Sequence, residues 1–180
     1  STCNKSETRN VGKKLAPKAT LNASTVTLKV KQSTSRLKVT RLAKGDYVKS
    51  WKSSNRKIFT VSGKSNGTCK ITGKKSGTAK LQITLASGLK KTVKVRVQTA
   101  AVKTSKITVS KNVTVRKGKR VTLKPVVTPF TSRQKVTYTS SNKKIATVSS
   151  KGVVTGKKKG TVKITVKSGS KSVKVTVKVK

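Results

Sequence analysis

Hydrophobic and polar residues alternate along much of this chain. The order Val93, Lys94, Val95, Arg96, Val97 is one example, and residues 173–179 again carry a valine at every second position. Successive side chains of a β-strand point to opposite faces, so this period of two places the valines on one face and the cations on the other. The pattern predicts antiparallel sheets with one buried face and one solvated face.

The alternating segments are short, and clusters of Gly, Ser, Asn and Lys separate them. Short strands with frequent turns are typical of β-sandwiches. No apolar run approaches the roughly 20 residues of a membrane-spanning helix. We therefore expect an all-β fold that does not insert into a membrane.

The chain contains an internal repeat. Residues 51–62 (WKSSNRKIFTVS) align with residues 138–149 (YTSSNKKIATVS), and residues 71–78 (ITGKKSGT) align with residues 154–161 (VTGKKKGT). The alignment slips by four positions between the two blocks, which predicts an insertion in the first copy near residues 63–69. These limits predict an N-terminal arm over residues 1–19, a first domain over 20–98, a linker over 99–105 and a second domain over 106–180.

The repeated motifs resemble those of tandem group 2 bacterial immunoglobulin-like domains. That family pairs an aromatic-x-Ser-Ser-Asn block with Ala-Thr-Val-Ser and then Gly-x-Val-Thr-Gly-x-x-x-Gly-Thr. Residues 150–161 fit this pattern closely, whereas the first copy departs from it because Phe59 replaces the small alanine. The resemblance covers nearly all of residues 20–180. It implies two tandem immunoglobulin-like β-sandwich domains with an extended N-terminal arm, on an extracellular or cell-surface protein of the adhesin type.

The motif also has a direct physical interpretation. Ser-Ser-Asn predicts a polar turn at the end of a strand, because these side chains can hydrogen-bond to nearby backbone. The aromatic residues that precede it, Trp51 and Tyr138, are expected in the sandwich cores.

Charge is the most unusual feature of the composition. The 180 residues include 46 Lys and Arg but only two acids, which gives a formal net charge of +44. Small domains usually carry a net charge of roughly 2–8. A field of this strength predicts non-specific binding to polyanions such as DNA, RNA, glycosaminoglycan, teichoic acid or other anionic surfaces. Sequence-specific reading of nucleic acid is not expected, because the chain has only five aromatic residues and no predicted helix.

Two kinds of candidate polyanion-binding residues stand out, namely cations spaced two or four apart along a strand and cations clustered in turns. The strand cations are Lys94, Arg96, Lys174 and Lys178, and the turn cations are Lys74, Lys75, Lys90, Lys91, Arg116, Lys117, Lys119, Arg120, Lys143, Lys144, Lys157, Lys158 and Lys159. The lysine-rich segments 73–77 and 156–160 lack the spacing of a phosphate-binding loop and are interpreted as charged turns.

The composition argues against catalysis. The chain has no His, and its two acids, Glu7 and Asp46, lie far apart in sequence, so no carboxylate pair or catalytic triad is available. We expect no enzymatic activity, no metal site and no cofactor. Cys3 and Cys69 are predicted to form one disulfide that pins the arm to the first domain, with two free thiols as the alternative.

Three functional hypotheses remain open. The first is a surface protein that binds anionic polymers. The second is a structural stalk, filament or adhesin subunit whose charge is incidental or engineered, and whose arm self-associates by adding a strand to a neighbour's sheet. The third is electrostatic adsorption to an anionic membrane or to lipopolysaccharide, without insertion and with an antimicrobial consequence.

Overall fold

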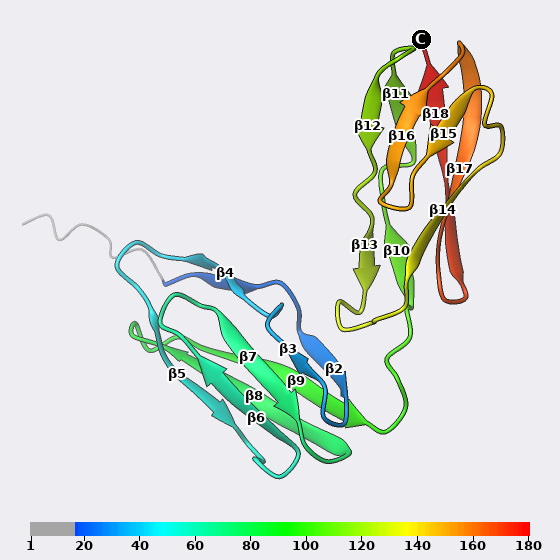
Figure 1. Cartoon of the computed structure of the whole chain (residues 1–180). Helices are drawn as coiled ribbons and strands as arrows, with labels where there is room; N and C mark the ends of the chain where they lie inside the picture. The colour runs from blue at the N-terminus through cyan, green and yellow to red at the C-terminus, as the bar shows by residue number, and fades with distance from the viewer. Residues whose placement is uncertain (1–16) are drawn as a thin grey trace, which may run out of the picture.

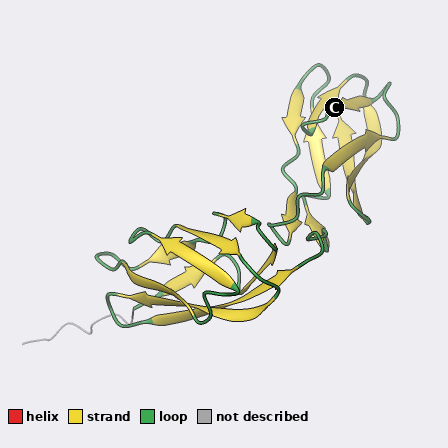
Figure 2. Cartoon of the chain, turned by 60° about the horizontal axis from the view of Figure 1, so that its bottom comes forward, coloured by secondary structure: helices red, strands yellow, loops and turns green. Residues whose placement is uncertain are grey.

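The computed structural model describes residues 17–180, and all of their regular structure is β-strand (Figures 1 and 2). Most of the predicted arm, including Cys3 and Glu7, lies outside the described residues. The strands form two consecutive β-sandwich domains, which confirms the predicted fold class. We call them domain 1 and domain 2.

The two domains contain nine strands each. Domain 1 comprises β1 (Ala19–Leu21), β2 (Thr25–Lys29), β3 (Ser33–Thr34), β4 (Val39–Leu42), β5 (Val48–Ser53), β6 (Phe59–Gly63), β7 (Cys69–Gly73), β8 (Gly77–Leu85) and β9 (Lys90–Gln98). Domain 2 comprises β10 (Lys106–Thr108), β11 (Asn112–Val115), β12 (Arg120–Thr122), β13 (Val126–Thr128), β14 (Val136–Ser140), β15 (Ala146–Val148), β16 (Val153–Gly156), β17 (Gly160–Ser168) and β18 (Lys171–Val179).

Strand order is identical in the two domains. Domain 1 has a four-stranded sheet β2-β9-β8-β5, a three-stranded sheet β3-β7-β6 and a pair β1-β4. Domain 2 repeats this as β11-β18-β17-β14, β12-β16-β15 and β10-β13. The first strand of each large sheet pairs in parallel with the last strand of the domain, β2 with β9 and β11 with β18. The internal repeat of the sequence is therefore a repeat of the whole domain.

The alternating pattern places the core as predicted. Val93, Val95 and Val97 of β9 are buried, while Lys94 and Arg96 between them are exposed. Buried residues of both sheets form one hydrophobic cluster in domain 1 and a second one in domain 2.

The two motif aromatics are not at the centre of the cores. Trp51 and Tyr138 are half-buried and pack against the margin of their clusters. Both lie on the outermost strand of a four-stranded sheet, so one side of each ring stays open. The buried centre of domain 1 is occupied by Phe59, whose counterpart in domain 2 is the much smaller Ala146.

The predicted insertion lengthens one hairpin. Strand β6 of domain 1 has five residues, whereas its counterpart β15 has three. At the tip, the side-chain oxygen of Asn66 accepts hydrogen bonds from the backbone amide of Thr68 at 3.1 Å and from its hydroxyl at 2.7 Å. The extra residues thus extend a regular hairpin and leave the strand order unchanged.

The two domains contact each other through the β13–β14 loop of domain 2. Phe130 of this loop packs against the hydrophobic cluster of domain 1, and its carbonyl accepts a hydrogen bond from Arg36 at 3.0 Å. The Gln32 side-chain amide donates to the carbonyl of Thr131 at 2.8 Å. Val102 and Thr104 of the connecting segment are also buried. The junction is therefore a packed contact.

Candidate anion-binding surface

All of the predicted polyanion-binding cations are exposed except Lys91. The register of β8 and β9 places Lys91 opposite the buried Ile83. Directly paired residues share a face of the sheet, so the side chain of Lys91 lies on the inner face at the end of the sheet. Lys91 is half-buried and does not belong to the outer row of Lys94 and Arg96.

Three turns of domain 2 meet at one end of the sandwich. The amide of Gly118 donates to the carbonyl of Gly156 at 2.8 Å, and the amide of Lys157 donates to the carbonyl of Ile145 at 2.7 Å. These bonds join the β11–β12, β14–β15 and β16–β17 turns. We call their exposed cations the cationic pole, which comprises Arg116, Lys117, Lys119, Arg120, Lys143, Lys144, Lys157, Lys158 and Lys159.

The motif asparagine shapes one turn of the cationic pole. The side-chain oxygen of Asn142 accepts a hydrogen bond from the amide of Lys144 at 3.0 Å, as the Ser-Ser-Asn motif predicts. Domain 1 has the same bond between Asn55 and Lys57, also at 3.0 Å. A side-chain cap of this kind fixes the backbone of the turn from which the adjacent lysines extend.

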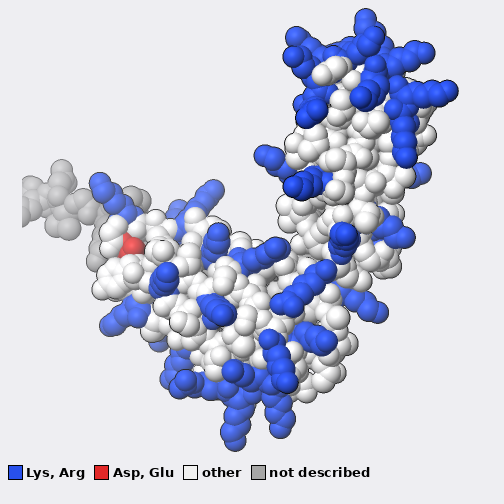
Figure 3. All heavy atoms as spheres, viewed as in Figure 1, with Lys and Arg blue, Asp and Glu red and all other residues white. Residues whose placement is uncertain are grey.

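No described Asp or Glu side chain lies at the cationic pole. Figure 3 shows Lys and Arg gathered over this end of domain 2. Asp46 is the only acidic residue among residues 17–180, and it belongs to domain 1. At physiological salt the field of an exposed charge is largely screened beyond about 8 Å. The cations of the pole therefore act on one another and on any anion nearby.

The strand cations form less concentrated rows. On the outer face of domain 1, Lys94 lies directly opposite Lys80 of β8, and like charges at such a position repel each other. In domain 2, Lys174 and Lys178 flank Thr176, whose hydroxyl accepts a hydrogen bond from the ammonium group of Lys163 at 2.6 Å. The sequence pattern missed Lys80 and Lys163, because the register between strands is not visible along a single strand.

The turn cations Lys74 and Lys75 occupy the equivalent end of domain 1. Their amides donate to the carbonyl of Ile58 at 2.7 and 3.2 Å, as the corresponding amides of domain 2 do to Ile145. Arg56 and Lys57 lie in the adjoining β5–β6 turn and are also exposed. Lys90 is exposed at the start of β9.

Asp46 has a structural role that its neighbours explain. One carboxylate oxygen accepts a hydrogen bond from the hydroxyl of Ser87 at 2.6 Å, and the other accepts from the amides of Ser87 and Tyr47, both at 3.0 Å. The bond from the Ser87 hydroxyl contributes most to holding the pKa of Asp46 below its ordinary value. Asp46 thereby links the β4–β5 loop to the β8–β9 turn.

Cys69 is buried in β7, where its thiol lies 3.5 Å from the carbonyl of Leu37. Burial raises the pKa of the Cys69 thiol to about 11, which makes the thiolate scarce at neutral pH. The predicted partner, Cys3, lies outside the described residues, and the disulfide stays a prediction.

Residues 17–180 contain no group of three or more His, Cys, Asp or Glu side chains that could hold a metal ion. Within the same part of the chain, no segment forms a helix long and apolar enough to cross a membrane.

Comparison with solved structures found several surface-layer protein fragments. Domains 1–6 of surface layer protein SbsC share 30% identity over 76% of this chain at a TM-score of 0.41, and the chain spans only 20% of that structure. Domains 4 and 5 of the same S-layer protein share 25% identity over 91% of this chain and 97% of theirs at a TM-score of 0.43. A GH10 xylanase from termite gut that contains a bacterial Ig-like domain shares 27% identity over 38% of this chain and 18% of its own, at a TM-score of 0.34.

Comparison with curated proteins gave no significant match. The model of the bacterial Ig-like domain (group 2) family matches residues 102–179, which contain every strand of domain 2. Domain 1 has the same strand order and the same turn motif. The chain thus carries a group 2 bacterial Ig-like domain as its second domain, preceded by a domain of the same architecture.

Proposed function

We propose that this protein is a non-enzymatic cell-surface or extracellular module that binds anionic polymers through its cationic exterior, most strongly at the cationic pole. The observation that carries the proposal is the meeting of three cation-bearing turns at one end of domain 2, joined by backbone hydrogen bonds. The formal net charge of +44 places further cations over the rest of the surface, which add to the attraction once a polyanion has come close.

Binding of this kind is driven by the release of counterions from the polymer. Each lysine that neutralises a phosphate displaces a condensed cation, so affinity falls steeply as the salt concentration rises. Residues two apart on one strand are separated by roughly 6.5–7 Å, a spacing that lets the rows on β9 and β18 follow a polymer with closely spaced charges. Lysine ammonium groups act as hydrated point charges, which favours attraction over selectivity.

The test is retention on DNA, heparin and teichoic acid columns over a salt series, with two variants of equal net charge. One replaces Lys117, Lys119, Lys143, Lys144, Lys157 and Lys158 of the cationic pole with Gln. The other replaces six exposed lysines of domain 1 that lie outside the candidate set with Gln, namely Lys38, Lys44, Lys49, Lys52, Lys64 and Lys70. The pole variant should elute at clearly lower salt, and its salt slope should fall by about 0.9 for each phosphate that it no longer neutralises.

Two outcomes would count against the proposal. Elution of the unaltered protein from every column near physiological salt would end the polyanion hypothesis. Elution of the two variants at the same salt concentration would show that polyanions bind equally over the whole cationic surface. The cationic pole would then have no special role.

A structural role as part of a stalk is the second candidate, and the packed junction favours it. Phe130, Gln32 and Arg36 connect the domains through apolar and polar contacts, as a tandem array under tension would need. Sedimentation and electron microscopy of the full chain would decide between filaments and single molecules. Assembly through the N-terminal arm predicts that removing residues 1–16 abolishes filaments, and a strict monomer would exclude this assembly.

A further inference from the structure

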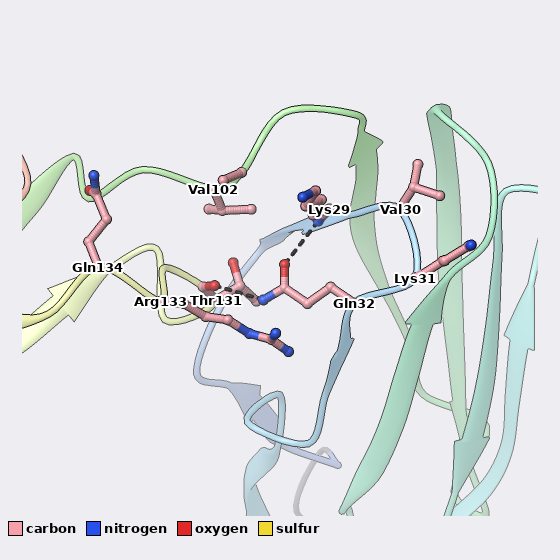
Figure 4. A pocket seen from close by; sticks show the side chains of 9 residues that line it. Lys29, Val30, Lys31, Gln32, Val102, Thr131, Arg133 and Gln134 are labelled. Atoms are coloured by element: carbon pink, nitrogen blue, oxygen red, sulfur yellow. Dashed lines mark hydrogen bonds between the residues drawn. The ribbon is translucent and has the colours of Figure 1, made fainter.

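A crevice of about 560 Å³ lies where the two domains meet (Figure 4). Lys29, Val30, Lys31 and Gln32 of the β2–β3 turn form one wall, and Thr131, Arg133 and Gln134 of the β13–β14 loop form the other. Ala101 and Val102 of the connecting segment complete the lining. The crevice exists only because both domains contribute to it.

The floor of the crevice is held in place by one hydrogen bond within domain 1 and two between the domains. The side-chain oxygen of Gln32 accepts from the amide of Lys29 at 2.9 Å, and its nitrogen donates to the carbonyl of Thr131 at 2.8 Å. The hydroxyl of Thr131 donates to the carbonyl of Thr27 at 2.5 Å. Gln32, Val102 and Thr131 are all buried. A site that is already ordered avoids much of the entropy cost of binding.

The crevice is lined by cations from both domains and lies far from the described acid. Lys29 and Lys31 come from domain 1 and Arg133 from domain 2, and Figure 4 shows the Arg133 side chain extending toward Gln32. Asp46 is bonded to Ser87 just before β9, whereas the crevice adjoins the end of β9, where the amide of Val30 bonds to Gln98. The length of β9 separates them by roughly 27 Å. The potential in the crevice is therefore positive.

The backbone at Lys31 provides a second, independent observation. Lys31 has a φ of 70° and is the only non-glycine residue of positive φ within residues 17–180. Its counterpart in domain 2 is Gly118, with a φ of 78° and the equivalent hydrogen bonds. Lysine is disfavoured in this conformation and glycine is not. Residues in disfavoured backbone conformations cluster at ligand sites. The lysine at this position is therefore consistent with a role of its ammonium group in binding a ligand at the rim of the crevice.

We propose that the crevice binds a sugar of one or two rings that carries a carboxylate or phosphate group. The volume of the crevice lies in the range of small-molecule sites, which occur preferentially at domain interfaces. The planar guanidinium of Arg133 is suited to carboxylate and phosphate, and the ammonium groups of Lys29 and Lys31 add charge. Val102 offers apolar contact, and the side chain of Gln134 supplies an amide group for a sugar hydroxyl. The site is separate from the cationic pole and does not depend on its function.

The test is a titration of the isotope-labelled full chain, followed by NMR at constant ionic strength. Glucuronic acid and glucose 6-phosphate should shift the amides of residues 29–32, 101–102 and 131–134, whereas glucose and sulfate should not do so at the same concentration. A glucuronic acid-containing tetrasaccharide added in a parallel titration tells a free acidic sugar from a unit of a polymer. Tighter binding of the tetrasaccharide points to a polymer, and equal binding points to the free sugar.

Two variants make the result specific. Lys31→Gly relieves the backbone and removes the cation, so affinity should fall about tenfold while the melting temperature changes little. Arg133→Gln should weaken binding by a similar factor, whereas Lys31→Arg and Lys38→Gln should retain it. The proposal would be overturned if Lys31→Gly bound the acidic sugars with unchanged affinity. It would also be overturned if the amide chemical shifts at the cationic pole changed as much as those at the crevice.

The experiment also separates this proposal from the proposed function. Lys31→Gly should still be retained on the polyanion columns, because the cationic pole is intact. The pole variant with six Gln residues should still bind the acidic sugars.

Discussion

Asp46 is a single carboxylate in a strongly cationic domain, and its surroundings use it as a hydrogen-bond acceptor. It receives bonds from Ser87 and Tyr47, and no lysine is needed to explain its depressed pKa. A group whose pKa is lowered by folding stabilises the folded state above its unfolded pKa. That stabilisation disappears as the pH falls through the folded pKa.

Replacing Asp46 with Asn should therefore reduce the acid sensitivity of domain 1. Between about pH 5 and pH 2, the melting temperature of the unaltered protein should fall more than that of Asp46→Asn, because only the carboxylate becomes protonated. Thermal unfolding followed by circular dichroism measures both. If the melting temperatures of the two proteins fell in parallel over this pH range, the Asp46 carboxylate would not be the source of the acid sensitivity.

Residue types predicted some local features and missed others. The Ser-Ser-Asn turns formed as expected, because their bonds run between residues two apart in sequence. Trp51 and Tyr138 were expected in the cores but lie at the margins, since burial depends on whether a strand is central or outermost. The positive φ of Lys31 could not be predicted, because lysine itself gives no such signal.

Among the strands, the β17–β18 hairpin shows most directly how alternation produces the fold. Ile164 lies opposite Val175, and both are buried, while Lys163 and Lys167 on β17 are exposed. Apolar pairs across the two strands hold the sheet to the core, and the cations remain in water. The same register therefore builds the core and the charged exterior.

Ile164→Ala should destabilise domain 2 by about 2–5 kcal/mol, because it leaves a cavity among buried side chains. Lys167→Ala, on the opposite face of the same strand, should change the free energy of unfolding by less than about 0.5 kcal/mol. Chemical denaturation of the two variants measures the difference. Similar effects would mean that the inner and outer faces of β17 have been assigned wrongly.

Strand faces could be predicted from the sequence, but strand partners could not. Alternation specifies which side of a strand is apolar and is silent about its neighbour. The parallel pairing of β2 with β9, and the opposition of Lys80 to Lys94, follow from contacts between distant segments. For the same reason the sequence identified the cations of the pole one turn at a time and did not bring the turns together.

At the scale of the whole molecule, the contact between the domains gives equivalent turns of the two repeats different roles. Gln32 connects domain 1 to the carbonyl of Thr131, and its counterpart at the corresponding turn of domain 2 is Lys119 of the cationic pole. The same turn thus joins domains in one repeat and presents charge in the other. A repeat alignment alone could not reveal this difference, because nothing in the motif marks which turn meets a neighbouring domain.

Gln32→Ala should loosen the junction. It removes a buried hydrogen bond and leaves the Thr131 carbonyl without that donor, at a cost of about 1–3 kcal/mol to the junction. Small-angle X-ray scattering should then show a broader distribution of interdomain distances. Lys119→Ala is the matched control at the equivalent turn and should leave the scattering curve unchanged. An unchanged scattering curve for Gln32→Ala would show that the Gln32–Thr131 hydrogen bond does not hold the domains together.

The parallel pairing of the first and last long strands has a mechanical consequence. Because β2 and β9 run in the same direction, the chain enters domain 1 at one end of this pair and leaves it at the other, and β11 and β18 repeat the arrangement. Tension applied along the chain therefore pulls each pair in shear and stresses its hydrogen bonds together. A tether built from such domains resists extension without any change in its surface chemistry.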